Sequence, residues 1–196
     1  MAYSRIVVAF SGGLDTSYLV AWLKDTTEAE VVTVTVDTGG FPPEELQEIE
    51  ARSAEVGADL HVTVDARQET FDRVVKTLIQ GNVMRGNAYP LCVSAERITQ
   101  AEVMVRKAKE LGADAIAHGS TGAGNDQVRF DVSVRTLAPN MDIIATIRDQ
   151  GISREEETAW LRSKDIEVLD KTSTYSVNAG MWGTTIGGGE THDAWS

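Results

Sequence analysis

Cysteine is nearly absent from this sequence, since Cys92 is the single one among 196 residues. One thiol cannot form an intrachain disulfide or a cysteine-rich metal site, and such usage is typical of a reducing compartment. Long apolar runs are absent too, and none approaches the ~18 residues that a membrane span requires. The first residues lack the charged and apolar regions of a signal peptide. We therefore expect a cytoplasmic protein with no membrane partner.

Positive charge is scarce as well. Lysine and arginine number 18 against 30 aspartates and glutamates, which gives a formal net charge of -12. This balance repels polyanions, and no cluster of basic residues offsets it, so we expect no nucleic-acid partner. With 42% hydrophobic and 24% charged residues, the composition is typical of a folded protein with one sizeable core.

The stretch FSGGLDTS at residues 10–17 joins an apolar run at residues 6–10 to an amphipathic segment at residues 17–24. This arrangement predicts a strand, a tight turn and a helix. The stretch has neither the Gly-Lys-Ser/Thr ending of a Walker A loop nor the Gly-x-Gly-x-x-Gly pattern of a dinucleotide fold. It therefore indicates neither of those two nucleotide sites.

The chemistry of this turn suits an anion. Gly12 and Gly13 allow positive φ and let the main chain approach a ligand closely. The helix that follows offers unpaired N–H groups and the positive end of its dipole. Further hydroxyl donors are Ser11, Thr16 and Ser17. These features predict a phosphate cradle, and a simple connection with Asp15 or Thr16 as the helix cap is the competing interpretation.

The rest of the chain alternates between short apolar runs and amphipathic segments. Such alternation predicts an α/β fold with a doubly wound parallel sheet and helices on both faces, and ligands then bind beyond the carboxyl ends of the strands. Further strands are expected at residues 31–36, 60–64, 115–117, 143–145 and 166–168. Further helices are expected at residues 42–56, 69–80, 95–111 and 153–164. Ser94 is placed to cap one of these helices, and Ser153 with Glu156 forms a capping box for another.

A second glycine-rich turn, HGSTGAGNDQVR at residues 118–129, follows one of these apolar runs. Its glycines and short polar side chains pack poorly in a core but suit a ligand-facing loop. His118 could act there as a base, although a hydrogen-bonded structural histidine is the more common role. The residues after it allow two assignments. Residues 128–134 alternate as in a strand, while Asn125 and Asp126 are typical of a helix start.

Together these motifs resemble a known enzyme family. SGGLDTS is similar to the pyrophosphate loop of the ATP pyrophosphatases, which cleave ATP between its α and β phosphates. With Tyr89, Ser94, HGSTGAGNDQVRF and TYSVNAGMWGTTIGGG, the chain resembles the argininosuccinate synthase family over nearly its whole length. The resemblance implies an adenine nucleotide alpha hydrolase-like fold, with a helix after Asn125. It also implies an ATP-dependent carbon–nitrogen ligase of arginine biosynthesis and the urea cycle.

Members of that family use ATP to adenylate the ureido oxygen of citrulline, and aspartate then displaces AMP to give argininosuccinate. The resemblance therefore implies ATP and Mg²⁺ as cofactors, with the metal held through the ATP phosphates, and citrulline and aspartate as substrates. Arg129 suits a substrate carboxylate, because its planar fork can pair with one bidentately. No side chain is an obvious strong base, so we expect positioning to supply most of the rate.

The resemblance also implies residue roles. ATP would contact Ala9, Phe10, Ser11, Gly12, Gly13, Leu14, Asp15, Thr16, Ser17, Val36 and Gly119. Citrulline would contact Tyr89, Ser94, Asn125, Arg129, Ser176 and Thr185. Aspartate would contact Thr121, Asn125 and Asp126. The expected catalytic residues are Asp15, which would orient the metal or a phosphate-bound water, and Asp126, which would face the amino group of aspartate.

From residue 169 onward the sequence changes character, with glycines and tryptophans in place of amphipathic runs. We expect residues 1–168 to form the ATP-binding domain, and residues 169–196 to be an irregular segment that leads into a second domain. In the resembling family that second domain completes the citrulline site and builds a tetramer, so the resemblance implies a homo-oligomer.

Other functions stay open. A tRNA-thiolating enzyme with the same loop would carry catalytic cysteines and a basic face, which disagrees with one cysteine and a net charge of -12. A nucleotide-binding module without turnover would bind ATP and release no pyrophosphate. A structural flavodoxin-like domain would leave three ligand-facing motifs unexplained.

Overall fold

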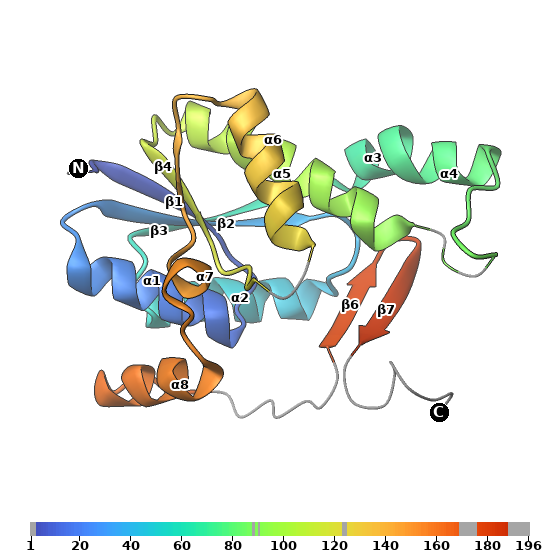
Figure 1. Ribbon diagram of the computed structural model, residues 1–196. Helices are drawn as coiled ribbons and strands as arrows, with labels where there is room; N and C mark the ends of the chain where they lie inside the picture. Colours follow the sequence, from blue (N-terminus) through green and yellow to red (C-terminus); the bar gives the residue numbers. More distant parts are fainter. Residues whose placement is uncertain (1–2, 88, 90, 123–124, 169–175, 188–196) are drawn as a thin grey trace.

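The structure is a computed structural model that describes residues 3–87, 89, 91–122, 125–168 and 176–187. At its centre five parallel strands form one sheet in the order β3-β2-β1-β4-β5 (Figure 1). The strands are β1 (Arg5–Ala9), β2 (Glu30–Asp37), β3 (Leu60–Asp65), β4 (Ala115–His118) and β5 (Asp142–Ile144). The predicted parallel sheet is thereby confirmed.

The central strands are rich in buried apolar residues because both faces of the sheet are covered. Ile6 and Val8 of β1 belong to one core, and Val7 belongs to the other. In β2, Val31 and Val32 divide between the two cores in the same way, and all five side chains are 0% exposed. Each such burial stabilises the fold by roughly 1.5–3 kcal/mol, so a continuous apolar run specifies a central strand.

Two layers of helices enclose the sheet (Figure 1). One layer contains α1 (Leu14–Thr26), α2 (Pro43–Glu55), α7 (Thr146–Gln150) and α8 (Arg154–Ser163). The other contains α5 (Cys92–Glu110) and α6 (Asp126–Leu137), which pack against each other. Between β3 and α5 a further helical stretch runs as α3 (Arg67–Thr70), the π-helical turn η1 (Phe71–Val75) and α4 (Lys76–Gln80).

Most predicted helices are confirmed, and the capping box of α8 is present, with Ser153 N–H donating to Glu156 Oε2 at 2.8 Å. The prediction that Ser94 caps a helix was wrong, because α5 begins at Cys92 and Ser94 lies in its first turn. The strand predicted at residues 166–168 was also wrong. These residues follow α8 and pair with no described strand, and the side chains of Ile166 and Val168 pack beside the core of the α1 layer instead.

The segment after β4 is a helix, as the family resemblance implies. Within α6, Phe130 and Val134 lie four residues apart and are buried in the core, at 8% and 0% exposure. Val128 and Val132 also lie four residues apart and are 55% and 57% exposed. The alternating apolar pattern that resembled a strand thus comes from two different faces of a helix, one buried and one exposed.

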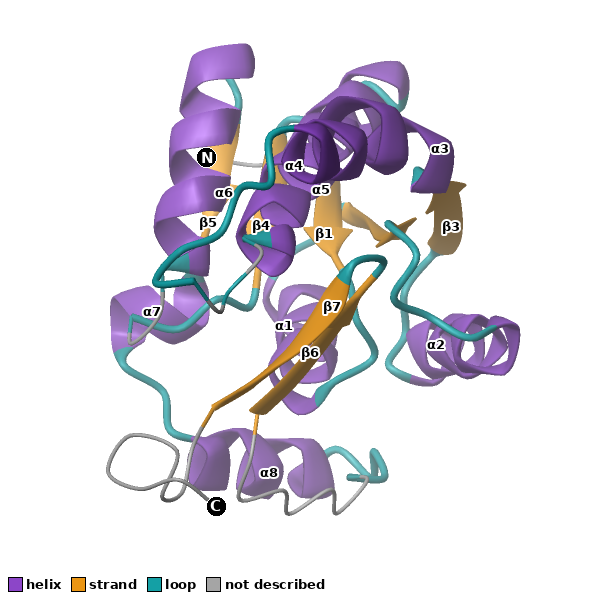
Figure 2. Cartoon of the chain, turned by 90° about the vertical axis from the view of Figure 1, so that its right-hand side faces the viewer, coloured by secondary structure: helices purple, strands orange, loops and turns teal. Residues whose placement is uncertain are grey.

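Residues 176–187 form a β-hairpin, so the expectation of an irregular segment was wrong for them. Strand β6 (Ser176–Gly180) pairs antiparallel with β7 (Gly183–Gly187). The hairpin lies against α5, at the side of the sheet where the parallel strands end (Figure 2). Its outer face carries Val177 and Ile186, which are 59% and 58% exposed. The rest of residues 169–196 lies outside the described residues.

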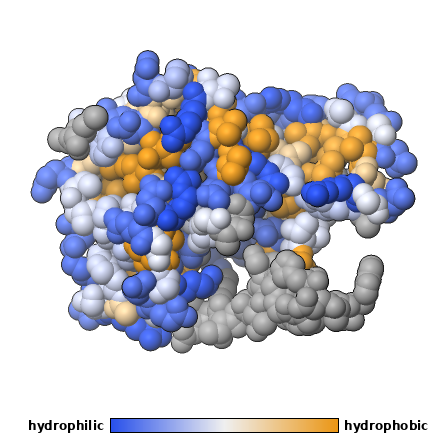
Figure 3. All heavy atoms as spheres, viewed as in Figure 1, coloured by the Kyte–Doolittle hydropathy of each residue, from blue (hydrophilic) through white to orange (hydrophobic). Residues whose placement is uncertain are grey.

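Apolar side chains also remain at the surface over α6 and over the α3–α4 stretch (Figure 3). On the latter and in the loop just after it they include Phe71, Ile79 and Met84, at 40%, 45% and 45% exposure. Among the described helices, none combines the length and the apolar character needed to cross a membrane.

Candidate functional site

The turns that follow β1 and β4 meet at the carboxyl edge of the sheet. β1 is the central strand, pairing with β2 on one side and β4 on the other, and such a switch point is where ligands bind in open α/β sheets. Gly119, just after β4, touches the first turn of α1, which directly follows the turn after β1. A Cβ at this position would lie 3.2 Å from Asp15 Cβ and 3.3 Å from Thr16 Cγ2. The two glycine-rich turns therefore form one surface.

Phe10 anchors the start of the turn after β1. Its N–H donates to Val34 O at 3.0 Å, and its carbonyl accepts from Thr35 Oγ1 at 2.8 Å. Its side chain is 4% exposed. Gly12 follows with φ +73°, a left-handed conformation that glycine adopts without strain. These contacts direct the chain from β1 into α1.

Helix α1 begins at Leu14 with Gly13 as its N-cap, and no described side chain caps it. Thr16 instead bridges the turn, since its hydroxyl donates to Gly13 O at 3.3 Å and lies 3.4 Å from the Ser11 hydroxyl. The competing interpretation, in which Asp15 or Thr16 caps the helix, is therefore wrong. The first N–H groups of α1 are left without a cap, as an anion site requires.

A buried arginine lies directly behind this turn. Arg52 of α2 is 7% exposed, and its Nε donates to Ser17 Oγ at 3.0 Å. Ser17 is itself 0% exposed, and its N–H donates to Gly13 O at 2.9 Å. The Nη1 of Arg52 pairs with Glu55 Oε2 at 2.9 Å, and the Glu55 side chain is 46% exposed. An acidic protein thus places a buried guanidinium, balanced by a carboxylate nearer the surface, beside the predicted phosphate cradle. No sequence pattern indicated this buried arginine, because an arginine on an amphipathic helix is typically exposed.

Replacing Arg52 with methionine is expected to weaken ATP binding about tenfold, or about 1.4 kcal/mol, because a buried charge attracts an anion more strongly than an exposed one. The control is Arg106→Met on α5, which removes the same charge from a side chain that is 52% exposed and paired with Glu69. In isothermal titration calorimetry the ATP affinity of Arg106→Met should stay within about twofold of wild type, since exposed charges are screened. Equal losses in both variants would contradict a local role for Arg52.

His118 supports the second turn from inside. It is 2% exposed, its Nε2 lies 2.9 Å from Asp131 Oδ1, and its Nδ1 accepts from Ser120 N–H at 3.3 Å. Burial lowers the pKa of His118, and the hydrogen bond to Asp131 opposes that shift. A neutral ring with the proton on Nε2 satisfies both contacts. The geometry favours the structural role for His118 over that of a base.

Four of the predicted substrate residues form one hydrogen-bonded chain. Tyr89 Oη accepts from Ser94 N–H at 3.2 Å. Arg129 then joins Ser94 to Asp126, with Nη2 donating to Ser94 Oγ at 3.2 Å and Nη1 donating to Asp126 Oδ1 at 2.6 Å. Hydroxyl, guanidinium and carboxylate groups from three stretches of sequence thus gather between α5 and α6. Such a set can pair with both charged groups of an amino acid.

Arg97 of α5 extends this chain and was missed in the sequence. Its Nε donates to Asp126 Oδ2 at 3.2 Å, and its Nη2 donates to Asn178 Oδ1 of β6 at 3.0 Å. Thr185 of β7 lies directly opposite Asn178, and opposed residues of an antiparallel pair share one face. The hairpin therefore presents Thr185 on the same face as the residue that contacts α5.

The remaining predicted residues are placed individually. Thr121 and Asn125 are exposed in the connection between β4 and α6. Ala9 is the last residue of β1, and Val36, 6% exposed, lies near the end of β2. Ser176 begins β6, but its side chain lies outside the described residues.

Asp15 lies against a second carboxyl group, that of Glu157 on α8. Glu157 is 1% exposed, and among the described residues its Oε2 has no hydrogen-bond partner. Burial, and then the charge of Asp15, raises the pKa of Glu157 to about 8. When protonated, Glu157 can donate a hydrogen bond to Asp15, whereas two ionised carboxylates would repel. The sequence concealed this pair, because residues 155–157 are an acidic run at a helix start.

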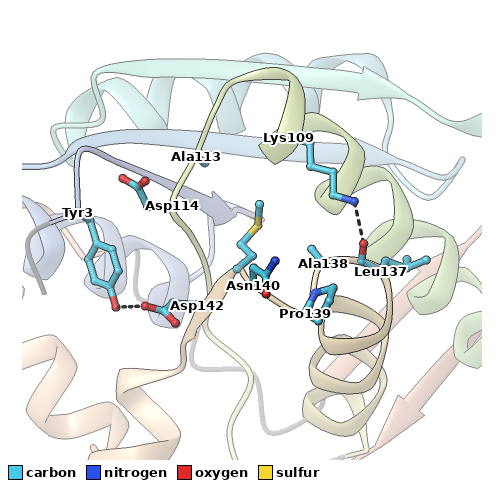
Figure 4. Close-up of a pocket in the computed structure, with 10 residues that line it drawn as sticks. Tyr3, Lys109, Ala113, Asp114, Leu137, Ala138, Pro139, Asn140 and Asp142 are labelled. Carbon is cyan, nitrogen blue, oxygen red and sulfur yellow. Dashed lines mark hydrogen bonds between the residues drawn. The ribbon is translucent and has the colours of Figure 1, made fainter.

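The groove in Figure 4 lies at the opposite edge of the sheet. Its volume is about 500 Å³, and its lining includes Tyr3, Asp114 and Asp142, which lie at the amino ends of β1, β4 and β5 (Figure 4). Tyr3 Oη donates to Asp142 Oδ2 at 3.1 Å, and Lys109 Nζ donates to Leu137 O at 2.7 Å. The groove is therefore distinct from the glycine-rich turns at the carboxyl edge.

Comparison with known proteins identifies the family and agrees with this fold. A family model described as the arginosuccinate synthase N-terminal HUP domain matches residues 5–167. The chain belongs to the argininosuccinate synthase family. This confirms the resemblance found in the sequence and assigns the sheet and its glycine-rich turns to the HUP fold.

Individual argininosuccinate synthases match nearly the whole chain. The relative from Sulfolobus acidocaldarius is 41% identical over 184 residues, which are 94% of this chain and 46% of the relative. The relative from Pyrobaculum aerophilum is 42% identical over 193 residues, which are 98% of this chain and 48% of the relative. The relative from Dictyoglomus turgidum is 38% identical over 197 residues, which are 100% of this chain and 49% of the relative. The chain thus spans about half the length of these argininosuccinate synthases.

A solved structure supports the fold independently. The crystal structure of a predicted subunit of tRNA methyltransferase from Methanocaldococcus jannaschii matches with a TM-score of 0.54. The match covers 81% of this chain and 75% of that chain at 16% identity. At this identity the likeness shows a shared fold alone.

Proposed function

We propose that this chain is the ATP-, citrulline- and aspartate-binding domain of an argininosuccinate synthase. In that reaction ATP adenylates the ureido oxygen of citrulline and releases pyrophosphate. The amine of aspartate then displaces AMP to give argininosuccinate. The observation that best supports the proposal is the uncapped start of α1, which meets Gly119 of the second turn at one edge of the sheet.

ATP would lie with its β and γ phosphates on the turn after β1. Main-chain N–H groups at the start of α1 and the hydroxyls of Ser11 and Thr16 are suitable donors, and Arg52 supplies positive charge from behind. Fixing these two phosphates makes pyrophosphate the leaving group and leaves the α phosphate open to attack. Mg²⁺ would be held through the ATP phosphates.

The amino-acid substrates would use the chain of contacts between α5 and α6. Asp126 and Arg129 pair with each other at 2.6 Å, and this pairing would give way to substrate groups of opposite charge. Arg129 would pair with the carboxylate of citrulline, and Asp126 with the amino group of aspartate. Tyr89 and Ser94 would add hydroxyls beside Arg129.

The proposal is tested by pyrophosphate release from ATP and Mg²⁺, measured with and without citrulline and aspartate, together with equilibrium ATP binding. We expect ATP to bind and pyrophosphate release to require citrulline. Failure to bind ATP would contradict the assignment of the turn after β1. Binding without release would instead assign a nucleotide-binding module without turnover.

A further inference from the structure

A buried glutamate holds the hairpin against the rest of the protein. Glu96 of α5 is 1% exposed, and its Oε1 accepts the N–H of Met181, in the turn between β6 and β7, at 3.0 Å. The same carboxylate is hydrogen-bonded by the hydroxyl of Thr38, which directly follows β2 and is 2% exposed. One side chain therefore joins α5, the loop after β2 and the hairpin.

The surroundings of this carboxylate are tightly packed. A Cβ at residue 180 would lie 2.4 Å from both carboxylate oxygens of Glu96. Gly180 is outside the left-handed region, so its missing side chain is required by the closeness of Glu96 and not by its φ. A Cβ at residue 40 would lie 2.4 Å from Ala179 O. The hairpin and the loop after β2 thus approach more closely than side chains would allow.

Two hydrogen bonds and a nearby arginine stabilise this buried group. Burial raises the pKa of Glu96 to about 7, while the Met181 N–H, the charge of Arg97 and the Thr38 hydroxyl lower it. Arg97 does not pair with Glu96, because its guanidinium reaches Asp126 and Asn178. A buried carboxyl group is tolerated when such donors satisfy it, and these donors lie on the two segments it connects.

We propose that Glu96 is a positioning residue that docks the β6–β7 hairpin onto the loop after β2 and so holds Asn178 and Thr185 at the citrulline site. Its effect on citrulline rests on the proposed function, whereas the docking itself does not. Thr38 lies two residues after Val36, a predicted ATP contact. The anchor therefore links the substrate hairpin to the nucleotide side of the site.

Hydrogen–deuterium exchange tests the docking directly. In Glu96→Ala the N–H of Met181 loses its acceptor, and we expect the hairpin amides to exchange at least about tenfold faster, while those of β1 are unchanged. Glu96→Gln keeps an oxygen acceptor and is the matched control, so it should retain most of the protection. Unchanged exchange of the hairpin in Glu96→Ala would overturn the proposal.

A second variant acts from the other side of the contact and covers the case in which Glu96→Ala unfolds. Gly180→Ala places a Cβ against the carboxylate, so we expect it to displace Glu96 and to speed hairpin exchange to a similar extent. The double variant should exchange no faster than Glu96→Ala alone, because the obstructing carboxylate is then gone. Wild-type exchange in Gly180→Ala, or additive losses in the double variant, would contradict the contact.

The consequence for substrate is measured separately. In Glu96→Ala we expect the KM for citrulline in pyrophosphate release to rise about tenfold, while ATP affinity stays within about twofold, because the turn after β1 is untouched. An unchanged KM for citrulline with a loosened hairpin would overturn the positioning role. Absence of ATP binding in the wild-type protein would refute the proposed function, and hydrogen exchange would still decide the docking.

Discussion

Replacing Gly12 with alanine is expected to lower the affinity for ATP about 100-fold, or about 2.7 kcal/mol. Gly12 has φ +73°, where a side chain adds roughly 1–2 kcal/mol of strain, and a Cβ there would lie 3.2 Å from Ile49 Cγ1. The turn relieves both problems by rotating its peptide groups. That rotation moves the N–H groups away from the geometry that a phosphate requires.

The matched control is Gly112→Ala. Gly112 follows the C-cap of α5 with φ +65° and has no atom within 4 Å of the Cβ position, so an alanine there has the same conformational strain without the crowding. Both variants should lose roughly 1 kcal/mol of unfolding free energy, as measured by urea denaturation. Only Gly12→Ala should lose ATP affinity in calorimetric titration. Equal ATP affinities for the two variants would contradict the assignment of this turn as the phosphate cradle.

The parts of the site that the sequence predicted are those made by consecutive residues. A strand, two glycines and a helix start produce the turn after β1 from local geometry alone, so the strand, turn and helix could be predicted from the sequence. The parallel sheet was predictable for a similar reason, since apolar runs alternate with amphipathic segments. Both predictions depend on apolar patterns that repeat every few residues, and these patterns are determined by local backbone geometry.

The parts that the sequence concealed are contacts between distant segments. Arg52, Glu96 and Arg97 all lie on helices where a charged residue is typically exposed, and nothing local distinguishes them from solvated neighbours. Their roles come from partners that lie 29 to 85 residues away, such as Ser17, Asp126 and Met181. The hairpin was missed similarly, because glycine-rich strands carry a weak alternating pattern.

Replacing Glu157 with glutamine is expected to stabilise the protein at pH 8.5 by up to roughly 5 kcal/mol, because each pKa unit corresponds to about 1.4 kcal/mol. In the folded protein burial and Asp15 raise the pKa of Glu157 from 4.5 to about 8. Below pH 4.5 the group is protonated in both states and stability is complete. Between pH 4.5 and about 8 the unfolded chain releases the proton while the folded protein keeps it, so stability falls as pH rises.

A glutamine at position 157 does not titrate, and its side-chain amide can still donate an N–H to Asp15. The unfolding free energy of Glu157→Gln, measured by urea denaturation, should therefore match wild type at pH 4.5 and exceed it progressively up to pH 8.5. A gain that is the same at all pH values would show that the variant improves packing and that the titration of Glu157 has no part in stability.

The neighbouring glutamate provides a control of opposite sign. Glu156 is held by the capping box, and the N–H of Ser153, then its hydroxyl, lowers the pKa of Glu156. Its contribution to stability is present above its unfolded pKa and is lost as pH falls through the folded value. Glu156→Gln should therefore be less stable than wild type at pH 8.5, where Glu157→Gln is more stable. Opposite shifts from two adjacent positions of one helix would show that burial against Asp15, and not the acidic character of α8, makes Glu157 destabilising at alkaline pH.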